Sequence, residues 1–179
     1  MVADLDRIME LERQGFAAGH QEQRSAYAQR IASFPKGSLM AWLGDDNVGC
    51  VFTEIWRWEP TVNAAHFTLG HDIRDRHDAV HGTELYISSM TLSPAVRGRG
   101  LGRALLQGCL ARIAQAYPAL TSALLLVNAD WGAARRIYAT AGFLQIARLE
   151  DFFHSGSAQR ADGIVMRAAI GRFGSNRRD

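Results

Sequence analysis

The sequence is poor in cysteine and has no long apolar run, and each absence excludes a class of protein. Cys50 and Cys109 are the only cysteines among 179 residues, too few for a disulfide framework and without the spacing of metal ligands. No apolar stretch approaches the roughly 20 residues that a membrane-spanning helix needs. Asp4, Asp6 and Glu10 lie near the start, where a secretion signal would carry basic and then apolar residues. We therefore expect a cytoplasmic protein without a metal site or a membrane partner.

Charge of one sign is also scarce. The formal net charge is only +2, whereas nucleic-acid binders usually concentrate basic residues on one face. Arginines gather at 97–103 and near the end of the chain, but aromatic residues do not alternate with them, so we expect no nucleic-acid partner. A chain of this length fits one hydrophobic core. We predict a single domain over residues 1–170 and a flexible basic tail over residues 171–179.

The first third of the chain predicts two helices and a hairpin. Asp4 is a suitable N-cap for a helix with apolar residues three and four positions apart, and Gly19 is expected to end it. A second amphipathic segment covers residues 21–34. Residues 38–44 and 48–58 are apolar and flank a Gly-Asp-Asp-Asn turn, which predicts an antiparallel hairpin. Because so few residues precede the first helix, any strand before it is expected to be short or absent.

The rest of the chain alternates strands and helices. Residues 59–82 have little apolar periodicity and contain four histidines, so they are predicted to form a long loop that either covers a functional site or is mobile. Beyond the loop, the hydrophobic pattern switches between the strand and the helix period. It predicts strands at 84–92, 123–127, 143–149 and 163–170, and helices at 102–116 and 130–142. This order is typical of an α/β domain.

A turn of alternating arginine and glycine follows the strand at 84–92. It reads Arg97-Gly98-Arg99-Gly100-Leu101-Gly102-Arg103. Glycines remove Cβ atoms where a ligand must approach the backbone, and they allow positive φ. The helix that begins here adds unpaired N–H groups and the positive end of its dipole. The turn is therefore predicted to bind a pyrophosphate through main-chain amides, and it contains no carboxylate that would imply a magnesium ion.

Other phosphate-binding loops fit this turn less well. A nucleotide-binding P-loop needs Lys and then Ser or Thr after its last glycine, but Arg103 and Ala104 follow Gly102. A dinucleotide fingerprint needs GxGxxG and a later acidic residue, whereas the spacing here is GxGxG. A glycine-rich connection without a ligand is the remaining alternative, and for a lone GxG it would be the better interpretation.

The turn and a later segment resemble motifs of the GCN5-related N-acetyltransferase (GNAT) family. The acetyl-coenzyme A loop of that family is R/QxxGxG/A on a strand-to-helix turn, which Arg97, Gly100 and Gly102 match, with Pro94 three residues ahead. A second family segment, which ends in YxxxGF, is matched by Tyr138, Gly142 and Phe143. The two segments occur in the family order. Together with the two helices and the hairpin, the resemblance covers about residues 4–170.

The resemblance implies an α/β fold with acetyl-coenzyme A (acetyl-CoA) in a cleft. The sheet would be mixed, with about six or seven strands and about four flanking helices, and splayed between the strands at 84–92 and 123–127. The pantetheine arm would pair with a strand edge, and main-chain amides would hold the pyrophosphate. Where the family often has Asn, this chain has Trp131, and Asn128 is the nearby alternative. The expected cofactor-binding residues are Met90, Thr91, Leu92, Arg97, Gly98, Arg99, Gly100, Leu101, Gly102, Arg103 and Asn128.

The resemblance also implies that an amine attacks the thioester directly, so the enzyme must supply a neutral amine and reprotonate the departing thiolate. Tyr138 matches the family tyrosine near the sulfur and is the expected proton donor. Members often carry an acidic residue or a histidine eleven positions before the arginine, and this chain has Tyr86 there. Glu84, Tyr86 and Ser88 alternate onto one strand face. Glu84 is either a base acting through a water or a solvated carboxylate, and His81 and the other loop histidines are further candidates.

The acceptor is expected opposite the cofactor. Five aromatic residues of the hairpin and the loop are predicted to lie there: Trp42, Phe52, Trp56, Trp58 and Phe67. The helix pair, the hairpin and the basic motif look similar to the arylalkylamine N-acetyltransferase branch, but Tyr86 and Ser88 replace its two strand histidines. A small primary amine is the favoured acceptor, and the resemblance implies a homodimer. The alternatives are a peptide or protein N-acetyltransferase and a non-catalytic acetyl-CoA-binding module.

Overall fold

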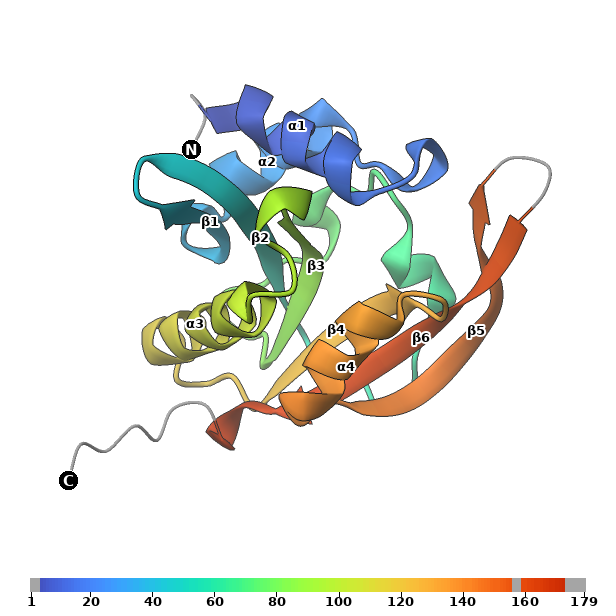
Figure 1. Ribbon diagram of the computed structural model, residues 1–179. Helices are drawn as coiled ribbons and strands as arrows, with labels where there is room; N and C mark the ends of the chain where they lie inside the picture. Colours follow the sequence, from blue (N-terminus) through green and yellow to red (C-terminus); the bar gives the residue numbers. More distant parts are fainter. Residues whose placement is uncertain (1–3, 156–158, 173–179) are drawn as a thin grey trace.

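A six-stranded mixed sheet runs through the protein (Figure 1). The computed structural model describes residues 4–155 and 159–172. The strands are β1 Ser38–Leu43, β2 Asp46–Trp56, β3 Glu84–Leu92, β4 Ser122–Asn128, β5 Leu144–Ser155 and β6 Gln159–Ala169. They lie in the order β1-β2-β3-β4-β6-β5, and among these pairs only β3 and β4 are parallel. With four α-helices in the same described residues, the predicted α/β architecture is confirmed.

Two helices, α1 (Leu5–Gly15) and α2 (Arg24–Ser33), lie next to β2 on one face of the sheet (Figure 1). The apolar stripe of α1 buries Ile8 and Leu11 completely, as the helical period predicts. These side chains share a core with α2 and with Phe52 of β2. The two helices therefore stand over the half of the sheet that β2 and β3 form.

The first helix ends at Gly15, before the predicted Gly19. A Cβ atom on Gly15 would lie 2.3 Å from Thr91 Oγ1, so the helix end can approach β3 this closely only because residue 15 is glycine. Phe16 is already extended, with φ −131° and ψ 145°. The helix thus stops where its backbone meets β3, and Gly19 lies in the connection to α2.

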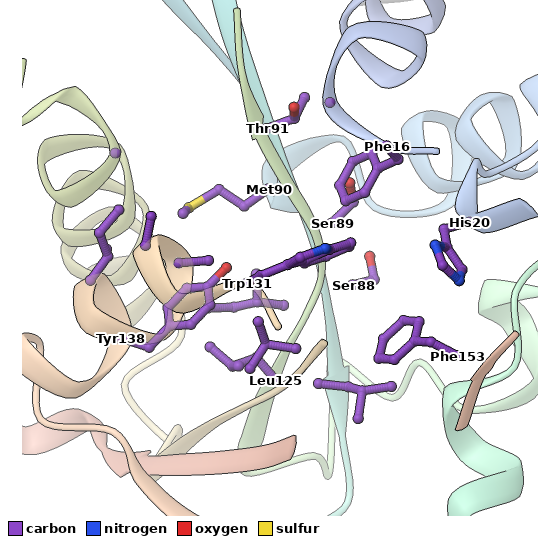
Figure 2. Close-up of a pocket in the computed structure, with 18 of the residues that line it drawn as sticks. Phe16, His20, Ser88, Ser89, Met90, Thr91, Leu125, Trp131, Tyr138 and Phe153 are labelled. Carbon is purple, nitrogen blue, oxygen red and sulfur yellow. The ribbon is translucent and has the colours of Figure 1, made fainter. Parts of the chain in front are cut away.

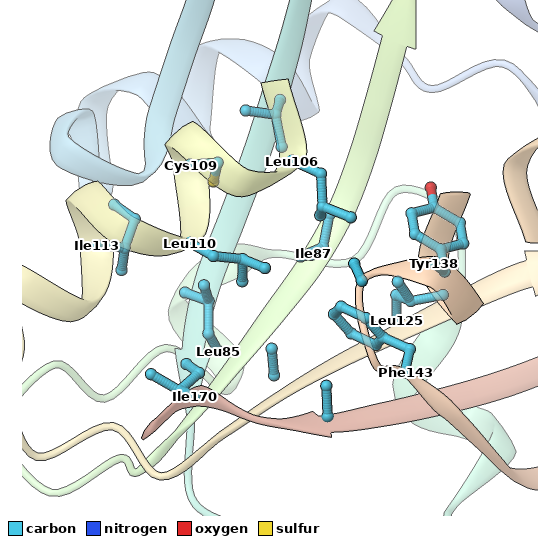
Figure 3. Packing of buried hydrophobic residues seen from close by; sticks show 14 of the residues in the cluster. Leu85, Ile87, Leu106, Cys109, Leu110, Ile113, Leu125, Tyr138, Phe143 and Ile170 are labelled. Atoms are coloured by element: carbon cyan, nitrogen blue, oxygen red, sulfur yellow. The ribbon is translucent and has the colours of Figure 1, made fainter. Parts of the chain in front are cut away.

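The helices α3 (Leu101–Ala116) and α4 (Gly132–Thr140) cover the other face (Figure 1). Their apolar residues meet the inward side chains of β3 and β4 in the main core (Figure 3). Full burial of each Leu, Ile or Phe there contributes about 1.5–3 kcal/mol relative to exposure. This core holds the elements that carry both family motifs in one arrangement. Its labelled members are Leu85, Ile87, Leu106, Cys109, Leu110, Ile113, Leu125, Tyr138, Phe143 and Ile170.

The sheet is splayed between β3 and β4. These strands pair only over Glu84–Ile87 and Ser122–Leu125, after which β4 continues beside β6 up to Asn128. The second half of β3, residues 88–92, has no strand partner on the β4 side among the described residues. The predicted opening of the sheet is confirmed, and we call residues 88–92 the free edge of β3.

A β-bulge marks the start of the free edge. Phe52 of β2 stands opposite Ser89, whereas the next residue, Thr53, stands opposite Ile87, so Ser88 is the extra residue. A bulge bends its strand and increases the local twist, which accounts for the divergence of β3 from β4 at this point. The bulge also interrupts the strict alternation that was expected for Glu84, Tyr86 and Ser88. It is Ser89 whose Oγ lies 3.1 Å from the Tyr27 hydroxyl of α2.

The predicted long loop folds back onto the sheet. It contains two 3-10 turns, Ala64–Phe67 and Ile73–Asp75, whose Phe67 and Ile73 side chains are buried. His77 Nδ1 accepts the backbone N–H of Ile55 at 3.0 Å. Burial lowers the pKa of His77, which keeps the ring in the neutral form that this hydrogen bond needs.

The last two strands are longer than predicted. β5 and β6 form a hairpin that extends beyond the rest of the sheet (Figure 1). Their register shifts between Leu149 and Phe153, and Asp151 there has φ 50°, so the local alternation of side chains is lost. The expected short first strand, at residues 1–3, and most of the predicted tail, at residues 173–179, lie outside the described residues.

Candidate active site

A cavity of about 1410 Å³ opens where β3 and β4 separate (Figure 2). Its walls come from α1, α2 and the connection between them, from β3, the start of α3, α4 and the β5–β6 hairpin. Pockets for one small molecule usually measure about 300–1,000 Å³, so this cavity is large enough for two substrates. Its lining includes the basic side chains Arg97 and Arg103, which belong to the glycine-rich turn, and the buried carboxylates Glu12 and Glu22.

The glycine-rich turn forms part of the cavity wall. Gly98 and Gly100 have φ 75° and 80°, and no heavy atom lies within 4 Å of the position where either would carry a Cβ. Gly100 is the N-cap of α3, so the first N–H groups of this helix have no acceptor within it. Arg97 Nε donates to Leu92 O at 3.1 Å and ties the turn to β3. The backbone of residues 98–103, which we call the phosphate cradle, is therefore open to an anion.

Most of the expected cofactor-binding residues line the cavity. They are Met90, Thr91, Leu92, Arg97, Gly98, Gly100, Gly102 and Arg103. Arg99 and Leu101 belong to the turn but are not among the lining residues. Gly102 serves packing as well, because its Cβ would lie 2.9 Å from Ile137 Cδ1 of α4. The amide of Asn128 is turned inward, where Oδ1 accepts the Asp130 N–H at 2.8 Å and shapes the turn before α4.

Tyr138 lies on α4 at the edge of the cavity. Its side chain is 8% exposed and belongs to the main core, and Figure 2 shows its hydroxyl directed into the cavity. Among the described residues, this hydroxyl has no hydrogen-bond partner. Burial raises the pKa of Tyr138 to about 12, so the phenol stays protonated at physiological pH and can act as a hydrogen donor.

Tyr86 also lines the cavity, but its ring serves packing. It stacks on Trp56 with 3.9 Å between ring centroids. Burial, and then the negative charge of Glu54, raise the pKa of Tyr86, so its phenol stays protonated near neutral pH and does not take up a proton.

Glu84 lies away from the cavity, at the end of β3 that remains paired with β4. Its Oε1 accepts from Arg167 Nε and from Ser122 Oγ, each at 2.7 Å, and its side chain is 2% exposed. The structure therefore gives Glu84 a partner in a buried ion pair and does not bring it to Tyr138. The sequence left two alternatives open for Glu84, a base in the cavity or a solvated carboxylate. The structure shows neither.

We expect Glu84→Gln to destabilise the protein without abolishing the activity of the folded fraction. Removing one charge of a buried pair leaves Arg167 uncompensated and costs about 3 kcal/mol. Urea unfolding measures the loss, and the transfer rate per folded molecule measures the catalytic effect. A variant of wild-type stability that has lost its activity would show that Glu84 acts in the reaction.

Next to the cavity lies a group of buried charged residues that were not predicted from the sequence. Arg30 Nη2 donates to Glu22 Oε2 at 2.9 Å, and Arg30 Nε lies 3.5 Å from Glu54 Oε1, with all three side chains buried. Burial by itself would lower the pKa of Arg30, but the two carboxylates outweigh burial and raise it, so the guanidinium stays charged. For Glu12, which also lines the cavity, one signal was available in the sequence. It follows Ile8 by four positions and so places a charged residue on the apolar stripe of α1.

His71 is the loop histidine that reaches the cavity. Nδ1 lies 2.9 Å from Thr68 O and Nε2 lies 2.8 Å from Glu54 Oε1. Burial opposes the charged ring, but the hydrogen bond and charge of Glu54 outweigh it and raise the pKa of His71. Both neighbours are acceptors, so both ring nitrogens carry hydrogen and neither has a free lone pair.

Four rings cross the cavity from one wall to the other (Figure 2). Trp131 lies 5.4 Å from Phe16 and 5.8 Å from Phe153, and His20 lies 5.2 Å from Phe153, measured between ring centroids. We call these rings the aromatic bridge. Of the five aromatic residues predicted for the acceptor pocket, only Phe67 lines the cavity, because the others point into the cores or lie on surfaces outside the cavity.

Metal ligation and membrane insertion find no support in residues 4–155 and 159–172. No three or more His, Cys, Asp or Glu side chains there are placed to hold a metal ion. None of the helices in these ranges is long and apolar enough to cross a bilayer.

Comparison with known proteins gives the family. Residues 5–143 match the family model described as Acetyltransferase (GNAT) family. No curated protein matches the chain. The loading GNATL domain of CurA from Lyngbya majuscula has a similar structure, with a TM-score of 0.78 at 15% identity over 96% of this chain and 95% of that one.

Two further solved structures are similar. The GphF GNAT-like decarboxylase in complex with isobutyryl-CoA has a TM-score of 0.76 at 17% identity, over 95% of this chain and 96% of that one. The ribosomal-protein-S18-alanine N-acetyltransferase from Escherichia coli has a TM-score of 0.69 at 17% identity, over 95% and 90% of the two chains. At such identities the likeness shows the fold. The family match covers more than half of the sequence and includes the phosphate cradle and Tyr138, and the chain therefore belongs to the acetyltransferase (GNAT) family.

Proposed function

We propose that the protein transfers the acetyl group of acetyl-CoA to a primary amine by direct attack of the amine. Acetyl-CoA supplies the activated acetyl group as a thioester. The free edge of β3 offers main-chain groups to the pantetheine amides, and the phosphate cradle offers amides to the pyrophosphate. The observation that carries this proposal is that both open into the same cavity.

The charged side chains around the cavity support this assignment of substrates. Arg97 and Arg103 lie beside or within the cradle, where they would attract the phosphates. Glu12 and Glu22 also line the cavity, and carboxylates favour a cationic amine over an anionic acceptor, although Arg30 offsets the charge of Glu22. The aromatic bridge crosses the cavity and reduces access of water to the thioester.

A small primary amine is the acceptor that we favour. The bridge limits the space above the free edge, and its rings suit an aromatic or alkyl amine. A peptide N-terminus is the alternative acceptor, since one of the similar structures is a ribosomal-protein-S18-alanine N-acetyltransferase. A homodimer and a cytoplasmic location remain part of the proposal.

Thiol release from acetyl-CoA tests this function with a panel of small amines and short peptides. We expect release that depends on the added amine and that is fastest with a small amine. Saturable acetyl-CoA binding without thiol release for any acceptor would identify a non-catalytic binding module instead.

The cradle predicts a specific loss of affinity in Gly100→Ala. Alanine at φ 80° is strained by about 1–2 kcal/mol, and its Cβ would occupy space open to the pyrophosphate. We expect the Kd for acetyl-CoA to rise about tenfold or more. Gly108→Ala is the matched control, because Gly108 lies in the same helix, is exposed and has no heavy atom near its Cβ position. Equal affinities of the two variants would contradict the role of the cradle.

A further inference from the structure

A line of hydrogen bonds leads from the cavity into the space between α1 and α2. Ser89, on the free edge of β3, lines the cavity, and its Oγ lies 3.1 Å from the Tyr27 hydroxyl oxygen. The Tyr27 hydroxyl donates to Glu12 Oε2 at 2.6 Å. Tyr27 and Glu12 are 0% and 2% exposed, whereas Ser89 is half-buried. Tyr27 and Glu12 also border the cavity, but because both are almost fully buried, Ser89 is the most accessible member of the line.

The direction of these hydrogen bonds follows from the carboxylate. Ionised Glu12 can only accept, so the Tyr27 hydroxyl hydrogen points at Glu12. The Tyr27 oxygen must then accept from Ser89, whose hydroxyl hydrogen points away from the cavity. The lone pairs of Ser89 Oγ remain available to an N–H group in the cavity, which is the arrangement that a route for outgoing protons needs.

Glu12 is suited to receive a proton. Its other oxygen, Oε1, accepts the backbone N–H of Glu22 at 2.7 Å, which fixes the carboxyl group. Burial raises the pKa of Glu12 and outweighs the hydrogen bonds from the Glu22 N–H and the Tyr27 hydroxyl, which lower it. The charge of Glu22 raises this pKa further, and that of Arg30 lowers it. The other titratable groups facing Glu12 are Tyr27 and Cys50. Burial raises the pKa of both, to about 12 for Cys50, so they stay neutral near pH 7.

We infer that Ser89, Tyr27 and Glu12 form the route by which the acceptor ammonium loses its proton before attack. This inference rests on the proposed function. An ammonium N–H bond breaks and its proton goes to Ser89 Oγ, the Ser89 hydroxyl proton goes to Tyr27, and the Tyr27 proton goes to Glu12 Oε2. The products are a neutral amine, two unchanged hydroxyls and one carboxylic acid. Glu12 returns its proton to solvent by the reverse route after the product leaves.

The position of Ser89 fits this role. It is adjacent to Met90, at which the proposed pantetheine site begins, and the bulge at Ser88 directs Ser89 toward α1 and α2. In Figure 2 Ser89 lies on the side of β3 near Phe16, with Tyr138 on the other side of the cavity. Proton removal and proton return would thus occur on opposite sides of the thioester. Glu84 lies outside the cavity and His71 has no free lone pair, so neither competes for this role.

Two acceptors of different basicity test the route. At about pH 7.5 an alkylamine is protonated, whereas trifluoroethylamine is largely neutral and has little need of a base. We expect Ser89→Ala and Tyr27→Phe to lower kcat/KM about 30-fold with the alkylamine, and to change it less than about threefold with trifluoroethylamine. A structural defect would lower both rates alike. Ser122→Ala, a buried serine outside the cavity, is the control and should match wild type with both acceptors.

The pH profile gives a second readout. In the wild-type protein, kcat/KM for the alkylamine should fall toward acid as Glu12 takes up a proton, at a pH above that of an ordinary glutamate. In Glu12→Gln only amine that is already neutral reacts, so kcat/KM should rise about tenfold per pH unit up to the pKa of the amine. If Tyr27→Phe or Glu12→Gln does not fold, Ser89→Ala still tests the route, because Ser89 lies at its cavity end.

Different results separate this inference from the proposed function. Suppose that the wild-type protein transfers acetyl groups. If the variants then lose activity equally with both acceptors, or if all three variants keep wild-type rates, the route is wrong but the acetyltransferase function is not. Absence of transfer to either amine by wild type would overturn both.

Discussion

Tyr138→Phe is expected to lower kcat on the order of 100- to 1,000-fold while the protein remains folded. The hydroxyl lies in the cavity without a described hydrogen-bond partner, so its removal costs little stability. The departing thiolate then lacks its proton donor.

The pH dependence of kcat sharpens this prediction. The pKa of Tyr138 is raised, so its proton is present below about pH 12 and is lost only above it. Wild type should therefore show no alkaline loss of kcat from this group up to about pH 10. Tyr117→Phe, a tyrosine at the end of α3 outside the cavity, is the matched control. Full kcat in Tyr138→Phe across this range would show that another group protonates the sulfur.

Arg30→Gln is expected to produce the largest loss of stability. Arg30 is the cation between Glu22 and Glu54, and removing it leaves two buried carboxylates without their positive partner. Breaking a buried ion pair from one side costs about 3–5 kcal/mol. For a chain of this size, that corresponds to a fall in Tm of roughly 10 °C or more. Thermal unfolding followed by circular dichroism measures it.

The control for Arg30 lies on the same helix. Arg24 forms an ion pair with Asp6 at 2.5 Å, but both side chains are exposed, at 54% and 90%. Exposed pairs contribute less than about 1 kcal/mol, so Arg24→Gln should leave Tm within a few degrees of wild type. Similar Tm values for the two variants would show that the ion pairs of Arg30 do not stabilise the fold.

The sequence predicted the parts of the fold that depend on local pattern. The strand at 84–92 has the expected bounds, and the helix at 101–116 begins one residue early. Tight turns and periodic apolar residues specify such elements within a few positions of the chain. The β5–β6 hairpin was underestimated because Glu150 and Asp151 interrupt its alternation, although the backbone continues to pair beyond them.

The candidate site was predicted to the same extent, because its contiguous motifs could be found in the sequence and its contacts between distant elements could not. The cradle and Tyr138 are carried by contiguous motifs, and the structure brings both to one cavity. Glu12, Tyr27 and Ser89 come from three elements, and only the folded chain shows that 62 positions separate two groups in hydrogen-bond contact. Glu84 was considered for the cavity because an alternating pattern predicts the face of the strand on which a side chain lies. The pattern does not predict how far that side chain is from the point where β3 and β4 separate.

Isothermal titration of acetyl-CoA into the folded protein tests the phosphate cradle most directly. We predict one saturable binding event per chain, weakened by salt because charged phosphates are bound. S-acetylpantetheine keeps the amides that pair with β3 but lacks the pyrophosphate, and it should bind much more weakly. Folded protein that shows no saturable heat with acetyl-CoA, or that binds both ligands equally well, would contradict the proposed site.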